Sequence, residues 1–206
     1  MEGFEMTTNK SVTAEMVTSR QTQEVQGQII MAKRFPRDEI AARNRILTAC
    51  QRKRLAEQAE YEYQRGTSKV TGVSIRLAEA MAQNWGNLDF GFVELEQRGG
   101  ESQVMAYCWD LETNTRQTKI FAVPHIRETK KGNYPLTGSR DIYELVANQA
   151  ARRVRACILG IIPGDIVEEA VERCRRTLIN GEEKPLEDLI KDCVRAAEKT
   201  YQVPQE

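Results

Sequence analysis

Apolar side chains recur every three or four residues in three parts of the chain, a spacing typical of one face of an α-helix. The predicted helices cover residues 37–65, 75–85 and 140–162. Pro36 suits the first turn of the first helix, where a missing N–H costs nothing. Ser74 is a candidate N-cap of the second helix, and Gly66 and Gly86 are candidate C-terminal ends of the first and second.

Between the second and third helices the apolar period changes to two, which indicates β-strands. The strands are predicted in the segments LDFGFVELEQR, SQVMAYCWDLE and RQTKIFAVPHIR. Gly99-Gly100 and the sequence TNT favour tight turns between them. Because these connections are too short for crossovers, the three strands should form an antiparallel meander. Residues 128–139, rich in Lys, Gly and Pro, are expected to form a loop.

These elements predict an α+β fold, in which a three-stranded antiparallel meander packs against helices. Four segments are expected along the chain. They are a mobile N-terminal arm (residues 1–22), a basic helical segment (23–66), an α-β-β-β-α core (67–164) and acidic C-terminal helices (165–206). The last segment should contain two helices, over residues 165–179 and 186–201.

Charge is balanced over the whole chain, with 30 basic and 30 acidic side chains, but it is unevenly distributed. Residues 33–65 carry nine Lys or Arg against five Asp or Glu, a net charge of +4. Residues 113–155 carry nine against three, or +6, and residues 165–206 carry seven against eleven, or −4. A basic body with an acidic tail suits a protein that binds polyanions. An uneven scatter of solvated charges is the alternative.

The cysteine pattern favours free thiols in a reducing compartment. The chain has five cysteines, an odd number, and no CxxC motif. With a single histidine, the chain offers few ligands for a Cys/His zinc site. No apolar run approaches the roughly 18 residues that span a bilayer, and the N-terminus does not resemble a signal peptide. We therefore expect a cytoplasmic protein without membrane contact, bound metal or cofactor.

Motifs of common enzyme classes are absent from the sequence. There is no GxxxxGK[ST] loop, no GxGxxG after a strand, no HExxH and no GxSxG. A metal-dependent nuclease remains an alternative, because Asp89, Glu94 and Glu96 fall on one predicted strand and Glu94 and Glu96 should share a face. His125, at a strand end, suits a hydrogen bond or a phosphate contact better than catalysis. Together these features favour a binding protein over an enzyme.

The third predicted helix carries three arginines close to its middle. At about 100° per residue, Arg152 and Arg155 lie together and Asn148 extends their row, on a face away from the apolar stripe. Arg153 leans toward the boundary beside Gln149. Three explanations stay open: a solvated or ion-paired face, a subunit contact, and a ridge that binds phosphates. Arginine suits the third because its planar fork binds phosphate bidentately and stacks on bases.

Further cations could continue this basic surface. They are Arg116 and Lys119 on the third strand, and Arg127, Lys130 and Lys131 at its end and in the following loop. Aromatic side chains available for base stacking are Tyr107, Trp109, Phe121 and Tyr134. Core or interface packing is the competing role for Trp109 and Phe121.

Three phrases carry a resemblance to a known group: GVSIRLAEAMAQNWGN, WDLETNTRQTKIFAVPH and YELVANQAARRVRACILGIIPGD. Together with the order of elements, they make the chain resemble phage and prophage single-strand annealing recombinases of the RecT/Redβ/Erf group. The resemblance covers roughly residues 23–175. It implies a small twisted sheet packed on helices and repeated around an oligomeric ring or helical filament.

The resemblance also implies a function and a set of partners. Such proteins bind single-stranded DNA, or the annealed duplex intermediate, by its backbone and anneal complementary strands without ATP during phage recombination. They work in the bacterial host cell beside a 5′→3′ exonuclease and a single-strand binding protein. By matching position, the resemblance places Arg152, Arg153 and Arg155 in the DNA groove, Arg116, Lys119, Arg127, Lys130 and Lys131 above it, and Arg76 on the preceding helix. The alternatives are a passive single-stranded nucleic-acid-binding protein, the nuclease named above, and a phage structural or assembly protein.

Overall fold

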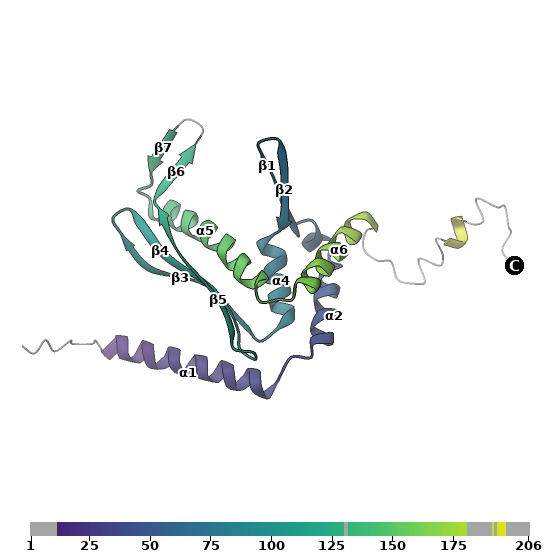
Figure 1. Cartoon of the computed structure of the whole chain (residues 1–206), viewed down its shortest axis with the longest axis horizontal. Coiled ribbons are helices and arrows are strands. Elements are labelled where there is room, and N and C mark those ends of the chain that lie inside the picture. Colours follow the sequence, from purple (N-terminus) through teal and green to yellow (C-terminus); the bar gives the residue numbers. More distant parts are fainter. Residues whose placement is uncertain (1–11, 130–131, 181–190, 192, 197–206) are drawn as a thin grey trace, which may run out of the picture. The chain divides into compact units, whose positions relative to one another are not determined.

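The computed structural model describes residues 12–129, 132–180, 191 and 193–196 (Figure 1). Its helices and antiparallel sheets confirm an α+β fold. Residue contacts divide the chain into two compact units. Unit 1 comprises Met1–Glu39 and Gly86–Cys157, and unit 2 comprises Ile40–Trp85 and Ile158–Glu206.

Unit 1 is built around a three-stranded antiparallel sheet in the order β3-β4-β5, as the alternating pattern predicts. The strands are β3 (Leu88–Arg98), β4 (Glu101–Asp110) and β5 (Thr115–Pro124). Gly99 and Gly100 form the first turn with φ of 62° and 80°, values that suit glycine far better than other residues. Asn114, with φ of 59°, lies in the second turn. The predicted meander and both of its turns are therefore confirmed.

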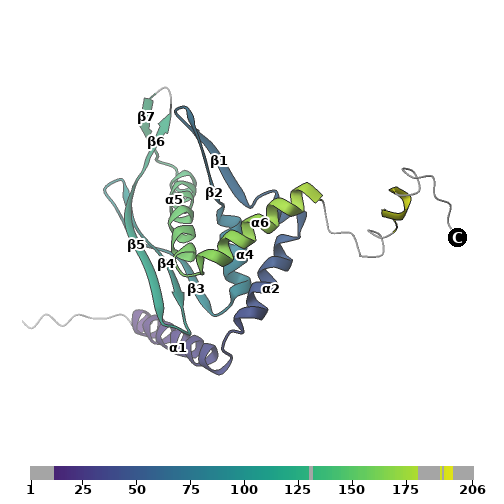
Figure 2. The ribbon, with the colours of Figure 1, turned by 45° about the vertical axis from the view of Figure 1, so that its right-hand side comes forward.

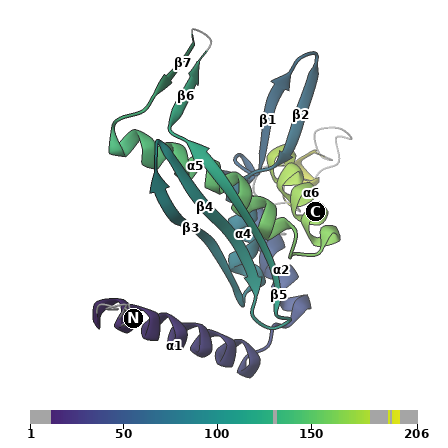
Figure 3. The same ribbon diagram turned by 60° about the vertical axis from the view of Figure 1, so that its left-hand side comes forward.

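Helix α5 (Ser139–Leu159) lies along one face of this sheet, as Figures 1, 2 and 3 show from three directions. Val104 and Val123 of the sheet pack against Val146 and Ala150 of the helix, and all four are buried. Along β4 every second residue is buried, which is the burial pattern of a strand with one face against a core. This contact forms the core of unit 1 and confirms the third predicted helix.

Helix α1 (Val12–Arg34) corrects the expectation that residues 1–22 lack regular structure. Its sequence contains many good helix formers, including Ala, Glu, Gln and Met. Met16, Ile30 and Met31 are all exposed and do not form one apolar stripe, so the helical period is not visible in the sequence. Residues 1–11 lie outside the described part of the chain.

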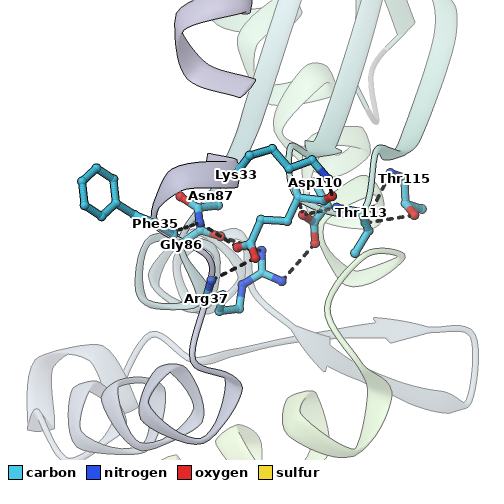
Figure 4. A network of polar contacts seen from close by, with 9 residues as sticks. Lys33, Phe35, Arg37, Gly86, Asn87, Asp110, Thr113 and Thr115 are labelled. Atoms are coloured by element: carbon cyan, nitrogen blue, oxygen red, sulfur yellow. Dashed lines mark hydrogen bonds and ion pairs between the residues drawn. The ribbon is translucent and has the colours of Figure 1, made fainter. Parts of the chain in front are cut away.

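A polar network fixes the C-terminal end of α1 to the end of the sheet (Figure 4). Arg37 donates to Asp110 Oδ2 at 3.0 Å and to the carbonyl oxygen of Gly86 at 2.9 Å. Lys33 Nζ donates to the carbonyl oxygen of Glu112, and Asn87 Nδ2 donates to the carbonyl oxygen of Phe35. The chain after α1 is therefore held beside the turn between β4 and β5.

A second correction concerns residues 128–139, which were expected to form a loop. Strands β6 (Ile126–Thr129) and β7 (Gly132–Pro135) instead form an antiparallel hairpin. Both strands are only four residues long and exposed along their whole length. No buried face imposes a period of two on such a short ribbon, so its sequence does not alternate between apolar and polar residues.

Unit 2 is built mainly from helices and one hairpin. They are α2 (Glu39–Cys50), α3 (Lys53–Ala56), β1 (Glu60–Arg65), β2 (Ser68–Val73), α4 (Ile75–Trp85) and α6 (Gly164–Asn180). Helix α4 buries Leu77, Met81 and Trp85 on one side. The Ser74 hydroxyl accepts a hydrogen bond from the Leu77 N–H at 3.2 Å, which confirms the predicted N-cap.

The single long helix predicted over residues 37–65 is wrong. The helix ends at Cys50, and Gly66, with φ of 61°, lies in the turn of the β1–β2 hairpin rather than at a helix end. The segment EYEYQR has a period of two, with Tyr61 and Tyr63 stacked at 6.0 Å. The many charged side chains before it made this alternation look like the exposed face of a helix.

The two units also differ from the expected division of the chain. Helix α4 belongs to unit 2, whereas the sheet and α5 up to Cys157 belong to unit 1, so residues 67–164 do not form one compact core. The predicted helix over 165–179 is confirmed as α6. The one predicted over 186–201 lies mostly outside the described residues. Within the described ranges, no helix has the length and apolar character needed to cross a membrane.

Candidate nucleic-acid interface

Helix α5 has two faces, as its sequence predicts. Val146, Ala150 and Val154 are buried, whereas Asn148 and Arg152 are exposed on the opposite side of the helix. Arg155 is part-buried and completes the row, because it follows Arg152 by three residues. We call Asn148, Arg152 and Arg155 the α5 ridge. It points away from the sheet of unit 1.

Arg153 lies on the flank of α5 that faces strand β5. Its guanidinium carbon is 4.5 Å from the centroid of the Phe121 ring, within the range of a cation–π contact. Its Nη1 also donates to the carbonyl oxygen and to Oε1 of Gln149, at 3.0 and 2.6 Å. These contacts fix the guanidinium beside the half-buried Phe121. In the Arg153–Phe121 pair, the aromatic ring therefore packs beside α5 and also stacks with the guanidinium.

Lys119 lies on the same flank, on the face of β5 that is turned to α5. Burial raises the pKa of the Cys157 thiol, and the positive charge of nearby Lys119 acts in the opposite direction. Lys119 is paired with Ala106 in the β4–β5 register, and the Cys157 thiol donates to the Ala106 carbonyl oxygen at 3.7 Å, so Lys119 lies near the C-terminal part of α5 in unit 1. The structure therefore places Lys119 and Arg153 on the side of α5 that faces β5, whereas Arg152 lies on the α5 ridge.

Arg116 lies on the opposite face of the sheet from Lys119. In the β4–β5 register Arg116 is paired with Trp109 and Lys119 with Ala106, and an odd separation along a strand means opposite faces. The Arg116 guanidinium carbon is 5.5 Å from the ring centroids of both Tyr107 and Trp109. The expectation that Arg116 and Lys119 extend one surface does not hold, and Arg116 forms a separate Arg–aromatic cluster.

The remaining predicted site residues lie elsewhere. Arg127 on β6 is directly opposite Tyr134 on β7, and both side chains are exposed. Lys130 and Lys131 lie outside the described residues. Arg76 is on α4 in unit 2, where its Nη1 is 3.6 Å from Glu79 Oε2. The ten predicted residues therefore do not form one surface within unit 1.

Several cations of α5, β5 and β6 differ from paired cations elsewhere in the described residues, although Arg140 of α5 pairs with Glu144. Arg116, Lys119, Arg127, Arg152 and Arg153 make no ion pair with any carboxylate in the part of the chain that the structure describes. In unit 2, by contrast, three arginines are neutralised by carboxylates: Arg43 by Glu169, Arg175 by Glu60 and Arg176 by Glu172. The acidic residues of α6 thus pair within their own unit.

The carboxylates considered for a nuclease do not gather. A β-bulge shifts the register between Glu94 and Glu96, so that Glu94 is opposite Val104 and Glu96 is opposite Gln103. The two side chains lie on opposite faces, and the expectation that they share one is wrong. Among the described residues, no group of three or more His, Cys, Asp or Glu side chains is arranged to hold a metal ion.

The contacts of His125 indicate a structural role. It is buried, and its Nε2 lies 2.7 Å from the Ser102 Oγ. Its backbone N–H donates to the carbonyl oxygen of Gly100, and its carbonyl oxygen accepts from the Leu136 N–H. The side chain therefore satisfies a buried hydroxyl, and the backbone of His125 connects the end of β5 to the segment after β7. The predicted hydrogen-bonding role is confirmed.

Two arginines that sequence reasoning passed over line a cavity in unit 2. The cavity has a volume of about 330 Å³ and is lined by Arg52, Arg54, Leu55, Gln58, Arg76, Glu79, Ala80 and Gln83. The basic run QRKR was visible in the sequence, but it was assigned to the exposed face of a long helix.

No protein-family model, curated protein or solved structure matches this chain.

Proposed function

We propose that the protein binds single-stranded DNA by its phosphate backbone and anneals complementary strands without ATP. The observation that carries the proposal is the set of cations on β5, β6 and α5 without carboxylate partners among the described residues. A cation that already forms an ion pair with a carboxylate gains little binding free energy from contact with a phosphate. Arg116, Lys119, Arg127 and Arg152 have no such carboxylate among the described residues and can therefore offer charge-assisted hydrogen bonds to phosphate.

The site chemistry supports contact with backbone and bases but not reading of sequence. Each phosphate that a Lys or Arg neutralises releases condensed counterions, which drives binding of any sequence. Arg153 on Phe121 and Arg116 on Tyr107 and Trp109 place guanidinium groups beside aromatic rings, and Arg127 is paired with Tyr134 in the β6–β7 register. Such pairs offer flat surfaces for unpaired bases, whatever their identity.

Annealing follows from the same contacts. Two complementary strands repel each other as polyanions, and each is compacted by pairing within itself. Neutralising the phosphates of an extended strand removes the repulsion and leaves the base edges free to test register. One protomer provides few contacts, so a homo-oligomer would bind a strand through many weak contacts at once.

The resemblance to single-strand annealing recombinases is the second support. On that basis we propose an oligomeric phage-type recombination protein that acts with a 5′→3′ exonuclease and a single-strand binding protein. A passive nucleic-acid-binding protein and a phage assembly protein are the rivals that a functional assay must separate.

A strand-annealing assay tests the proposal. Two complementary oligonucleotides, one carrying a fluorophore and the other a quencher, are mixed with and without protein at equal ionic strength. We expect pairing at least about tenfold faster with protein, without nucleotide or divalent metal. Binding without faster pairing would indicate a passive binder. Neither binding nor faster pairing would contradict the proposal, and metal-dependent cleavage of a labelled strand would indicate the nuclease.

A further inference from the structure

The cavity of unit 2 collects positive charge from two separate elements. Arg52 and Arg54 come from the start of α3, and Arg76 comes from the first turn of α4. With Glu79 as the one acidic residue among three arginines, its lining has a net charge of +2. Its volume of about 330 Å³ is at the small end of the range for ligand pockets.

Other cavities of the same unit do not share this charge. One of about 430 Å³ has two arginines against two glutamates, Glu169 and Glu172, and is neutral. Another, of about 510 Å³, has three glutamates against Arg175 and carries a net charge of −2. Of these three cavities, the one lined by Arg52, Arg54 and Arg76 is the one with a net positive charge.

The arginines that line the cavity have N–H groups that can donate hydrogen bonds to a ligand. The Nε of Arg52 donates to the carbonyl oxygen of Ala49 at 3.1 Å, which orients the guanidinium and leaves its two terminal amino groups for a ligand. Within the described ranges, Arg54 makes no ion pair with a carboxylate. Arg76 is held by Glu79 at 3.6 Å, a long contact between partly exposed groups that is worth little in water.

The remaining lining residues fit the same kind of ligand. Gln58 and Gln83 add amide N–H donors, whereas Leu55 and Ala80 form an apolar part of the wall. The lining thus combines three arginines and two glutamines, a set of donors suited to a small group with several negative oxygens. A phosphoryl group has that shape and charge, and arginine forks match it bidentately.

We infer that the cavity formed by Arg52, Arg54 and Arg76 binds a phosphoryl group. The group comes either from within a bound single strand or from a terminal phosphate monoester. The site does not depend on annealing and goes beyond the proposed function, because it lies in unit 2 and its cations differ from those of α5 and β5.

Two adjacent cations provide a matched pair of variants. Arg54 lines the cavity, and Lys53 beside it does not. Arg54→Ala and Lys53→Ala remove the same charge from the same short helix, and both side chains are exposed, so neither change should disturb folding. Arg76→Gln removes a cation from the second element that forms the wall and serves as the confirming variant.

The first measurement uses fluorescence anisotropy to determine the affinity for 3′-labelled oligothymidylates of ten nucleotides. One probe carries a 5′-phosphate and the other a 5′-hydroxyl. We expect Arg54→Ala to weaken binding by about tenfold or more, as for the loss of a charged hydrogen bond, and Lys53→Ala by less than about twofold. An equal loss for both probes would identify an internal phosphodiester, and a loss restricted to the phosphorylated probe would identify a terminal phosphate. Equal effects of Arg54→Ala and Lys53→Ala would overturn the inference.

A second measurement keeps the test independent of DNA annealing and DNA binding. Inorganic phosphate is compared with acetate at equal ionic strength by its effect on the melting temperature. We expect phosphate to raise the melting temperature of the wild type and of Lys53→Ala more than that of Arg54→Ala and Arg76→Gln. Comparison between variants removes the general stabilisation by phosphate salts. Equal shifts in all four proteins would overturn the inference even if the protein binds DNA.

Discussion

A single arginine shows how much structure one side chain can organise in unit 1. Only 5% of the Arg37 side chain is exposed, and it bonds Asp110, whose side chain is 6% exposed, and the carbonyl oxygen of Gly86 (Figure 4). Asp110 also accepts from the backbone N–H groups of Glu112 and Thr113. The guanidinium thus neutralises a buried carboxylate that orders the β4–β5 turn.

We predict that Arg37→Ala lowers the free energy of unfolding by about 3 kcal/mol, because it leaves the Asp110 carboxylate buried without its counter-charge. The control is Arg34→Ala, which removes an exposed cation from the end of α1 and should cost less than about 0.5 kcal/mol. Urea denaturation of both variants measures the difference. Equal costs would show that the buried pair does not stabilise the unit.

The thiols make a second prediction at the scale of residues. Cys50, Cys108, Cys157 and Cys174 are buried and form no disulfide, whereas Cys193 is exposed. Burial raises the pKa of Cys108 to about 12, so that near neutral pH it remains a protonated, unreactive thiol. Titration of the native protein with a thiol reagent at pH 7.5 should show one fast group, lost in Cys193→Ser, and five groups in denaturant. More than one fast group in the native protein would contradict the buried positions.

At the scale of elements, the spacing of apolar residues predicted the helices and strands that bury one face in a core. The meander, α4, α5 and α6 each have one side in a core, and their apolar spacing was visible in the sequence. The elements missed were those without such a face: α1, with exposed Met16 and Ile30, and the hairpins β1–β2 and β6–β7. The error over residues 37–65 came from charged residues, which are compatible with the exposed side of either structure.

The contact between α5 and the sheet makes a prediction about packing. Ala150 is fully buried against Val104, so a larger side chain has no room without shifting the helix. We predict that Ala150→Leu lowers the free energy of unfolding by about 1–3 kcal/mol. Ala156→Leu, at an exposed position of the same helix, is the control for helix propensity and should change it by less than about 0.5 kcal/mol. Thermal or urea unfolding measures both, and an equal effect would contradict the packing of α5 on β4.

At the scale of the molecule, the sequence predicted the classes of residue at the candidate site better than their arrangement. The α5 ridge followed from helical geometry alone, because Arg152 and Arg155 are three residues apart. The separation of Arg116 from Lys119 needed only strand alternation, which the prediction of one basic surface overlooked. The pairing of Arg175 with Glu60 could not be predicted, because it depends on a tertiary contact within unit 2, whereas Arg176 and Glu172 are four residues apart on α6 and follow from helix geometry.

The salt dependence of single-strand binding tests the central claim most directly. Each phosphate contact contributes about −0.7 to the slope of log K against log salt for a single strand. We expect Arg152→Ala combined with Arg155→Ala to weaken binding and to reduce the magnitude of this slope by about 1.4. Arg175→Ala combined with Arg176→Ala removes the same charge from paired positions and should leave the slope unchanged. An unchanged slope in the α5 variant, or the same change in both variants, would contradict phosphate binding at the α5 ridge.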